Sequence, residues 1–174
     1  MCNLELKIDL KSLEPGSKVI DFKLDNKYFE AIDAPDIRQG NLTATISIRK
    51  MADSFELNFH IQGFVVMTCD LCLDDMEQFI ETENRIFVKF GEEYSEEDDL
   101  IIIPKDEGIV DISWLIYEFI ELSVPIRHVH TPGKCNPAMT EMLKEHLATR
   151  SSNENEKQPI DPRWAELEKL KTTI

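Results

Sequence analysis

Apolar and polar residues alternate along the first part of the chain, with the period of half-buried β-strands. Residues 4–10 place four apolar side chains on one face and three charged side chains on the other. A second strand is predicted over residues 19–24, and a short helical turn over residues 27–32. The chain therefore opens with strands rather than with a long amphipathic helix.

The clearest pattern predicts a β-hairpin. Residues 42–48 and residues 55–61 each carry an apolar side chain at every second position, and a short polar turn separates them. After Gly63, residues 64–68 are predicted to form another strand that leads directly into Cys69-Asp70-Leu71-Cys72. This C-x2-C turn should therefore be mounted on a strand and positioned by a rigid scaffold.

The middle of the chain predicts two further strands and a helix. Residues 76–90 alternate as a long, bent strand that pairs back, and residues 91–99 indicate a solvated acidic loop. Residues 100–104 form a continuous apolar run, typical of a buried strand that ends at a proline. Asp111 is predicted to cap a helix whose apolar side chains repeat at helical spacing and pack on the sheet. This helix should end near Pro125.

Three units are predicted along the chain. Residues 1–147 form an α+β domain with an antiparallel sheet, open or barrel-like, a helix packed on it and a last helix over residues 137–147. Residues 148–160 have the composition of a flexible linker. Residues 161–174 begin with Asp161 and Pro162, typical of a helix start, so a helical C-terminal extension is expected.

Composition adds a strong acidic bias. The 174 residues carry a net charge of -15, and residues 69–99 alone hold twelve acidic side chains against two basic ones. Such a surface repels phosphate backbones and attracts basic proteins, although an acidic loop can also serve solubility alone. The first residues lack the basic and apolar regions of a secretory leader, and no apolar run is long enough to span a membrane. We therefore expect a soluble, cytoplasmic protein that has no membrane partner.

Three of the four cysteines and two of the four histidines lie in two segments, the C-x2-C turn and residues 125–135. Thiolates and an imidazole suit zinc, and four protein ligands would make the site structural. The alternative is that no cofactor binds, with the cysteines as small core residues and the histidines capping a loop. The candidate ligands are Cys69, Cys72, Cys135 and His130, with His128 as the alternative to His130.

The same cysteines and histidines allow two chemical alternatives to a metal site. A redox C-x2-C pair needs its first cysteine at a helix N-terminus, but here a strand leads in and acidic neighbours are expected to raise the thiol pKa values. Cys135 and His130 are the only nucleophile and base close together in sequence, and no oxyanion hole or glycine-rich phosphate pattern accompanies them. The sequence predicts no enzyme, no catalytic residue and no small-molecule substrate.

Several motifs follow one another in order along nearly the whole chain. No single one identifies a family, but the ordered set is specific. It comprises the strand and turn from Gly63 to Leu73, the acidic loop, the helix led by Asp111, Val124-Pro125 with His130 and Cys135, and Asp161-Pro162-Arg163-Trp164 with Leu167 and Leu170.

This set resembles the YceD family, the large ribosomal RNA subunit accumulation proteins. The resemblance implies a role in large-subunit ribosomal RNA accumulation, a gene commonly placed beside that of a basic large-subunit ribosomal protein, and no established catalytic activity. Many members carry a second cysteine pair, which here is reduced to Cys135 with His128 and His130 nearby. The C-terminal motif of Asp161, Arg163 and Trp164 is a candidate partner-binding element.

Charge and resemblance together predict a non-enzymatic factor in large ribosomal subunit biogenesis. We hypothesise an acidic adaptor or chaperone for a basic ribosomal protein or a pre-ribosomal particle. The main alternative is a direct RNA-binding module, and a further alternative is an enzyme that uses Cys135 and His130 in a concave pocket. The RNA-binding alternative requires one basic patch assembled from Lys18, Lys23, Lys27, Arg38, Arg49 and Lys50.

Overall fold

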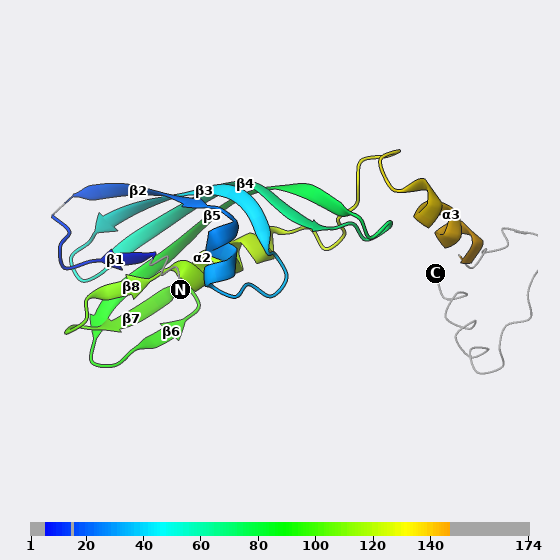
Figure 1. The fold of residues 1–174 in the computed structure, drawn as a ribbon. Coiled ribbons are helices and arrows are strands. Elements are labelled where there is room, and N and C mark those ends of the chain that lie inside the picture. Colours follow the sequence, from blue (N-terminus) through cyan, green and yellow to red (C-terminus); the bar gives the residue numbers. More distant parts are fainter. Residues whose placement is uncertain (1–5, 15, 147–174) are drawn as a thin grey trace, which may run out of the picture.

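The computed structural model describes residues 6–14 and 16–146. Strands dominate this part of the chain, and three helices accompany them (Figure 1). The elements are β1 (Lys7–Asp9), β2 (Ser17–Leu24), α1 (Asn26–Ala31), β3 (Gln39–Lys50), β4 (Phe55–Thr68), β5 (Asp75–Gly91), β6 (Ser95–Glu97), β7 (Leu100–Pro104), β8 (Ile109–Asp111), α2 (Ser113–Ser123) and α3 (Pro137–His146).

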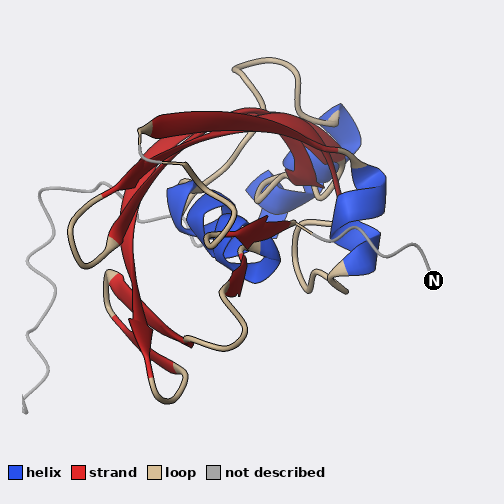
Figure 2. Ribbon diagram, turned by 90° about the vertical axis from the view of Figure 1, so that its left-hand side faces the viewer, coloured by secondary structure: helices blue, strands red, loops and turns tan. Residues whose placement is uncertain are grey.

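The main sheet has six strands in the order β2-β3-β4-β5-β7-β6, and β1 pairs with β8 in a separate two-stranded sheet. All of these pairings are antiparallel except that of β5 with β7, which is parallel. The sheet curves around α2 without closing into a barrel (Figure 2). The predicted α+β class is confirmed, with an open sheet in place of a barrel.

The core lies between the concave face of this sheet and α2. Alternate residues of β3 and β4 point inward and are fully buried, as the period-two pattern predicts. Phe119 of α2 meets Phe59 of β4 edge to face, with ring centroids 5.3 Å apart. The Tyr28 hydroxyl of α1 donates a hydrogen bond to the Ser113 carbonyl at 2.7 Å, which fixes α1 against the start of α2.

The β3–β4–β5 meander confirms the predicted hairpin but not the predicted break after Gly63. β4 runs through Gly63 as one strand of 14 residues, and all of it pairs with β5. Gly63 has φ +149, and a Cβ there would lie 2.3 Å from the Asn41 carbonyl oxygen and 2.5 Å from the Leu42 Cα. Glycine is needed here because the β3 backbone approaches too closely for a side chain, so the strand bends without ending.

Three local predictions need correction. The acidic loop contains the short strand β6, which pairs with β7. In β7 only Ile101 and Ile103 are buried, because this edge of the sheet is covered on one face alone. Asp111 lies at the end of β8 and Ile112 occupies the cap position of α2, although the Asp111 carboxylate does accept the Ser113 N–H at 2.9 Å.

Helix α2 ends at Ser123 and α3 begins at Pro137, both close to the predicted positions. The predicted linker and C-terminal helix, residues 148–160 and 161–174, lie outside the described residues, so the three-unit division stays a prediction. None of the helices in the described ranges is both long enough and apolar enough to cross a bilayer.

Substituting Gly63→Ala should lower the free energy of unfolding by about 3 kcal/mol or more, because the new methyl group must displace the β3 backbone. Gly16→Ala is the matched control, since Gly16 has φ +144 but no atom within 4 Å of its Cβ position. Gly16→Ala should lower the free energy of unfolding by only about 1–2 kcal/mol, the cost of a positive φ at a residue with a side chain. Urea denaturation of both variants checks this, and equal losses would show that the contact with β3 is not the constraint.

Candidate metal centre

The C-x2-C turn forms the tip of the β4–β5 hairpin. The last paired residues are Thr68 and Asp75, and the turn lies between them. The Cys69 N–H donates to the Asp74 carbonyl at 2.9 Å, and the Leu73 N–H donates to the Cys69 carbonyl at 3.0 Å. Leu73 has φ 62, which closes the turn just after the second cysteine. The side chains of Cys69 and Cys72 are both buried, so the turn presents its sulfur atoms inward.

The segment between α2 and α3 crosses this tip and is bound to it (Figure 1). The Asp70 N–H donates to the His128 carbonyl at 3.0 Å, and the His128 N–H donates to the Asp70 Oδ2 at 2.8 Å. The His128 Nε2 also lies 3.4 Å from the Asp70 Oδ1. These contacts join two segments 58 residues apart and bring His130 and Cys135 toward the hairpin tip.

This docking brings together four side chains: Cys69, Cys72, His130 and Cys135. Their ligand atoms all lie within 4.8 Å of one another. The two Sγ atoms of Cys69 and Cys135 are 3.9 Å apart, and the His130 Nδ1 lies 3.3 Å from the Cys72 Sγ. A tetrahedron with zinc bond lengths has edges of about 3.8 Å between sulfurs and about 3.6 Å between sulfur and nitrogen. The cluster therefore has the dimensions of a tetrahedral metal site.

A hydrogen bond fixes which nitrogen of His130 faces the cysteines. The His130 Nε2 lies 3.3 Å from the Asp75 carbonyl oxygen, an acceptor that requires a proton on Nε2. The Nδ1 is then unprotonated in the neutral ring, and it faces the sulfurs of Cys72 and Cys135 at 3.3 and 3.9 Å. A ligating histidine commonly donates its other N–H to a carbonyl in this way. The ring thus has the tautomer and orientation of a metal ligand.

The thiols of the cluster differ in their acidity. Burial raises the pKa of the Cys69 thiol, but hydrogen bonds from the backbone at Cys72 and His130 outweigh it and lower the pKa to about 6. Burial and the two neighbouring cysteine sulfurs raise the pKa of Cys135 to about 11. The expectation that acidic neighbours raise every thiol pKa is therefore wrong for Cys69, because backbone donors at the turn stabilise its thiolate.

The arrangement can hold a metal ion with four protein ligands and no position left open for a substrate. Of the two histidines proposed as ligands, His130 lies in the cluster, whereas the His128 ring is paired with Asp70 and is not part of it. The candidate partner-binding residues Asp161, Arg163 and Trp164 lie outside the described residues. The donor set and its spacing fit zinc.

Two supporting contacts were missed by the sequence reasoning. The pairing of Asp70 with His128 has no local signal, since it joins distant segments. Asn136 accepts the Ala138 N–H at 3.1 Å at the start of α3 and donates to the Asp74 carboxylate at 3.2 Å. Asn followed by Pro137 is a recognisable helix start, but its bond to the cysteine turn is not visible in sequence.

Replacing Asp70 with alanine should loosen the contact between the two segments, because it removes the acceptor of the His128 N–H and leaves only the backbone bond from residue 70 to the His128 carbonyl. The free energy of unfolding, measured with a chelator present, should fall by about 1–2 kcal/mol. Glu77→Ala is the control, since Glu77 is an exposed acid on the same hairpin. Hydrogen exchange at the His128 amide should accelerate in the first variant alone, and equal behaviour of both would contradict this account of the docking.

Comparison with known proteins places the chain in a family. The family model described as large ribosomal RNA subunit accumulation protein YceD matches residues 57–171, more than half of the chain and a range that includes all four cluster residues. Neither the curated proteins nor the solved structures contain a match. The description of the family points to a role in the accumulation of large-subunit ribosomal RNA. On the strength of that match, this chain belongs to the YceD family.

Proposed function

We propose that this protein is a non-enzymatic factor in large ribosomal subunit biogenesis that acts as an acidic adaptor. In this role it holds a basic large-subunit ribosomal protein, or binds a pre-ribosomal particle already coated with basic protein. The family description supports the role in ribosome biogenesis, and one observation supports the adaptor mechanism: a row of acidic side chains on the outer face of β5.

The acidic row follows directly from the period of the strand. Inward positions of β5, such as Ile80 and Ile86, are buried in the core, so the alternate positions face water. Near the hairpin tip four of these positions carry carboxylates and one carries the exposed Phe79, and positions two residues apart are spaced about 7 Å along the strand. The exposed acids of this row are Asp75, Glu77, Glu81 and Glu83.

The charge of the whole chain favours a basic protein over free RNA. A net charge of -15 repels phosphates at long range and attracts lysine- and arginine-rich surfaces. An adaptor needs this property, because a basic ribosomal protein must be kept from non-specific contacts with RNA until it is placed. Carboxylates on an ordered strand can screen such a protein and still release it to the more highly charged RNA.

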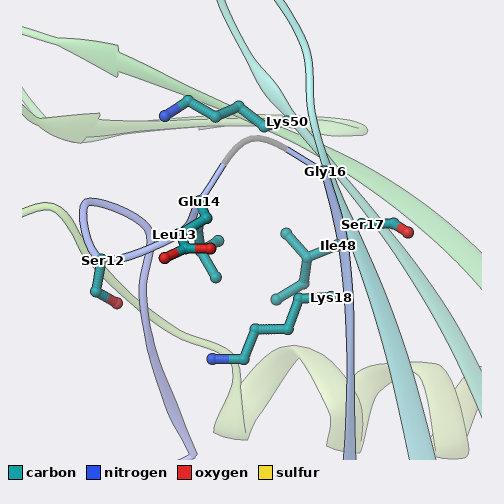
Figure 3. Close-up of a pocket in the computed structure, with 8 residues that line it drawn as sticks. All are labelled: Ser12, Leu13, Glu14, Gly16, Ser17, Lys18, Ile48 and Lys50. Atoms are coloured by element: carbon teal, nitrogen blue, oxygen red, sulfur yellow. The ribbon is translucent and has the colours of Figure 1, made fainter.

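The RNA-binding alternative requires six basic residues on one face, and their positions do not favour it. Along β2 and β3, Lys18 pairs with the buried Ile48 on the concave side, whereas Arg49 and Lys23 belong to the opposite face. Lys18 and Lys50 line a pocket of about 400 Å³, but Glu14 lines the same pocket (Figure 3). The remaining two residues, Lys27 in α1 and Arg38 before β3, lie outside both strands.

The environment of Cys135 does not favour the enzyme alternative in which Cys135 is the nucleophile and His130 the base. A pKa raised to about 11 keeps this thiol protonated at neutral pH, which is unfavourable for a nucleophile. Its neighbour His130 directs Nδ1 closer to Cys72 than to Cys135. The same four side chains are better suited to binding zinc as a structural ion, which would hold the segment after α2 against the hairpin tip.

Zinc should bind the purified chain with a stoichiometry of one, and Cys72→Ser or His130→Ala should abolish that binding. Zinc at a hundred times its dissociation constant should stabilise the fold by about 2.7 kcal/mol, because it binds the folded cluster alone. His128→Ala is the matched control and should keep its zinc. Metal analysis and thermal unfolding with and without chelator measure both effects; retention of zinc by the His130 variant would reject this ligand set.

Affinity for a basic large-subunit ribosomal protein should fall when Glu77, Glu81 and Glu83 are changed together to glutamine. Each pairing removed is worth a few tenths of a kcal/mol to about 1 kcal/mol, so we expect a loss of about tenfold at low salt. Raising the salt concentration should weaken the wild-type complex toward the same level.

The control for this experiment changes three exposed glutamates outside the row, Glu14, Glu30 and Glu107, to glutamine. Titration of the labelled ribosomal protein against each chain, with naked large-subunit RNA in parallel, separates the possibilities. Equal losses of affinity in the two triple variants would show that net charge alone, and not the acidic row, explains the binding. Binding of naked RNA in preference to the protein would favour the RNA-binding alternative.

A further inference from the structure

An open cleft of about 510 Å³ lies beside the cysteine cluster. It is formed where the inner side of the hairpin tip meets the segment that follows α2 and the residues before β3. Its lining is largely apolar and includes Ile37, Met67 and Val124. The roles proposed above for the cysteine cluster and for the acidic row of β5 do not involve this cleft.

Two apolar side chains of the cleft are held out in water. Leu73 is 64% exposed and Ile126 is fully exposed, and both line the cleft. Leu73 follows Cys72 at positive φ, and Ile126 lies two residues before His128, whose backbone is bound to Asp70. The backbone of the metal centre therefore fixes these side chains where a flexible loop could have folded them away. Exposed apolar side chains grouped at a cleft commonly mark a contact surface.

The ionisable side chains that line the cleft are acidic apart from Cys69 and His128, and the His128 ring lies against Asp70. Asp36, Asp70 and Glu121 line it, and no lysine or arginine does so among the described residues. The sequence neighbours Arg38 and Arg127 are not part of the lining. Burial, followed by the hydrogen bond and the negative charge of Asp36, raises the pKa of Glu121. The Asp36 N–H donates a hydrogen bond to the Tyr117 hydroxyl at 3.3 Å, which ties the backbone of Asp36 to α2, the helix that carries Glu121.

We propose that this cleft binds a short basic and amphipathic segment of a partner protein. One apolar side chain of that segment packs between Leu73 and Ile126, and flanking lysines or arginines pair with Asp36 and Glu121. The inference rests on the proposed adaptor function, because it states which part of a basic partner is recognised. Apolar contact gives the position of the segment, and the carboxylates select for positive charge.

The charges favour such a partner over the other occupants. A second copy of this chain also carries -15 and would bring acid against acid. The chain's own residues 147–174 hold five basic and five acidic side chains, so they bring no net positive charge to the cleft. Nucleic acid would place phosphates against three carboxylates.

Two labelled 12-residue peptides test the proposal with the full-length chain. The first alternates lysine or arginine with leucine, and the second has serine in place of leucine at the same net charge. Fluorescence anisotropy should show the leucine peptide binding about fivefold or more tightly than the serine peptide. Equal affinity for the two peptides would overturn the proposal, because general attraction to an acidic protein would then explain all of the binding.

Variants of the chain test whether the preference for the leucine peptide arises in this cleft. The double change Leu73→Asn and Ile126→Ser should remove the preference for leucine, and asparagine keeps the positive φ accessible at the first position. Val19→Ser is the control, since Val19 is 59% exposed on β2, away from the cleft. Asp36→Asn with Glu121→Gln should weaken binding of the leucine peptide about fivefold. A preference that survives the first double change would reject this cleft.

The chain's own C-terminal segment is tested separately. Trp164→Ser should leave peptide affinity unchanged, whereas a tenfold gain would show that this segment occupies the cleft and would overturn the proposal. Capture of the basic ribosomal protein by the Leu73/Ile126 variant keeps the two proposals apart. The wild-type chain could capture the ribosomal protein through the β5 row and yet bind the leucine and serine peptides equally. That result would support the adaptor function and reject the cleft as a binding site.

Discussion

The ladder between β4 and β5 is the constraint on which the rest of this structure depends. Fourteen consecutive pairs fix one register, and a shift by one residue would exchange the two faces of both strands. The same register buries Ile80 and Ile86, exposes the acids of the outer row and places the C-x2-C turn at the tip. Core, charge and metal-ligand geometry are therefore three results of one pairing. Gly63 makes that pairing compatible with β3, because the neighbouring backbone leaves no room for a side chain.

The candidate metal centre depends on a second contact, the docking of His128 on Asp70. The hairpin supplies two cysteines, and the docked segment supplies the histidine and the third cysteine. The same contact holds Ile126 in water beside Leu73 and closes one wall of the cleft. The four candidate ligands and the exposed apolar side chains of the cleft thus share one backbone support.

Local patterns predict the strands well because burial in a curved sheet alternates residue by residue. This is why β2 to β5, α2 and the strand-mounted cysteines could be predicted from sequence. The parallel pairing of β7 with β5 and the separate β1–β8 sheet could not, since period two carries no information about partners. Gly63 illustrates the limit: a glycine in a strand indicates either an end or a close approach, and only the position of Leu42 decides between them. For the centre, residue types indicated which side chains to consider as ligands, while the grouping of His130 rather than His128 with the cysteines depends on a contact across 58 residues.

The cluster also has a consequence for the order of folding. Cys69 and Cys135 are separated by 66 residues, and α2 lies between them, so the four side chains cannot meet until the chain beyond α2 has been synthesised. The hairpin tip with its two cysteines precedes the histidine and the third cysteine along the chain. Contacts this distant in sequence form late and slowly. Completion of the centre therefore marks a chain whose sheet, helix and following segment are already in place.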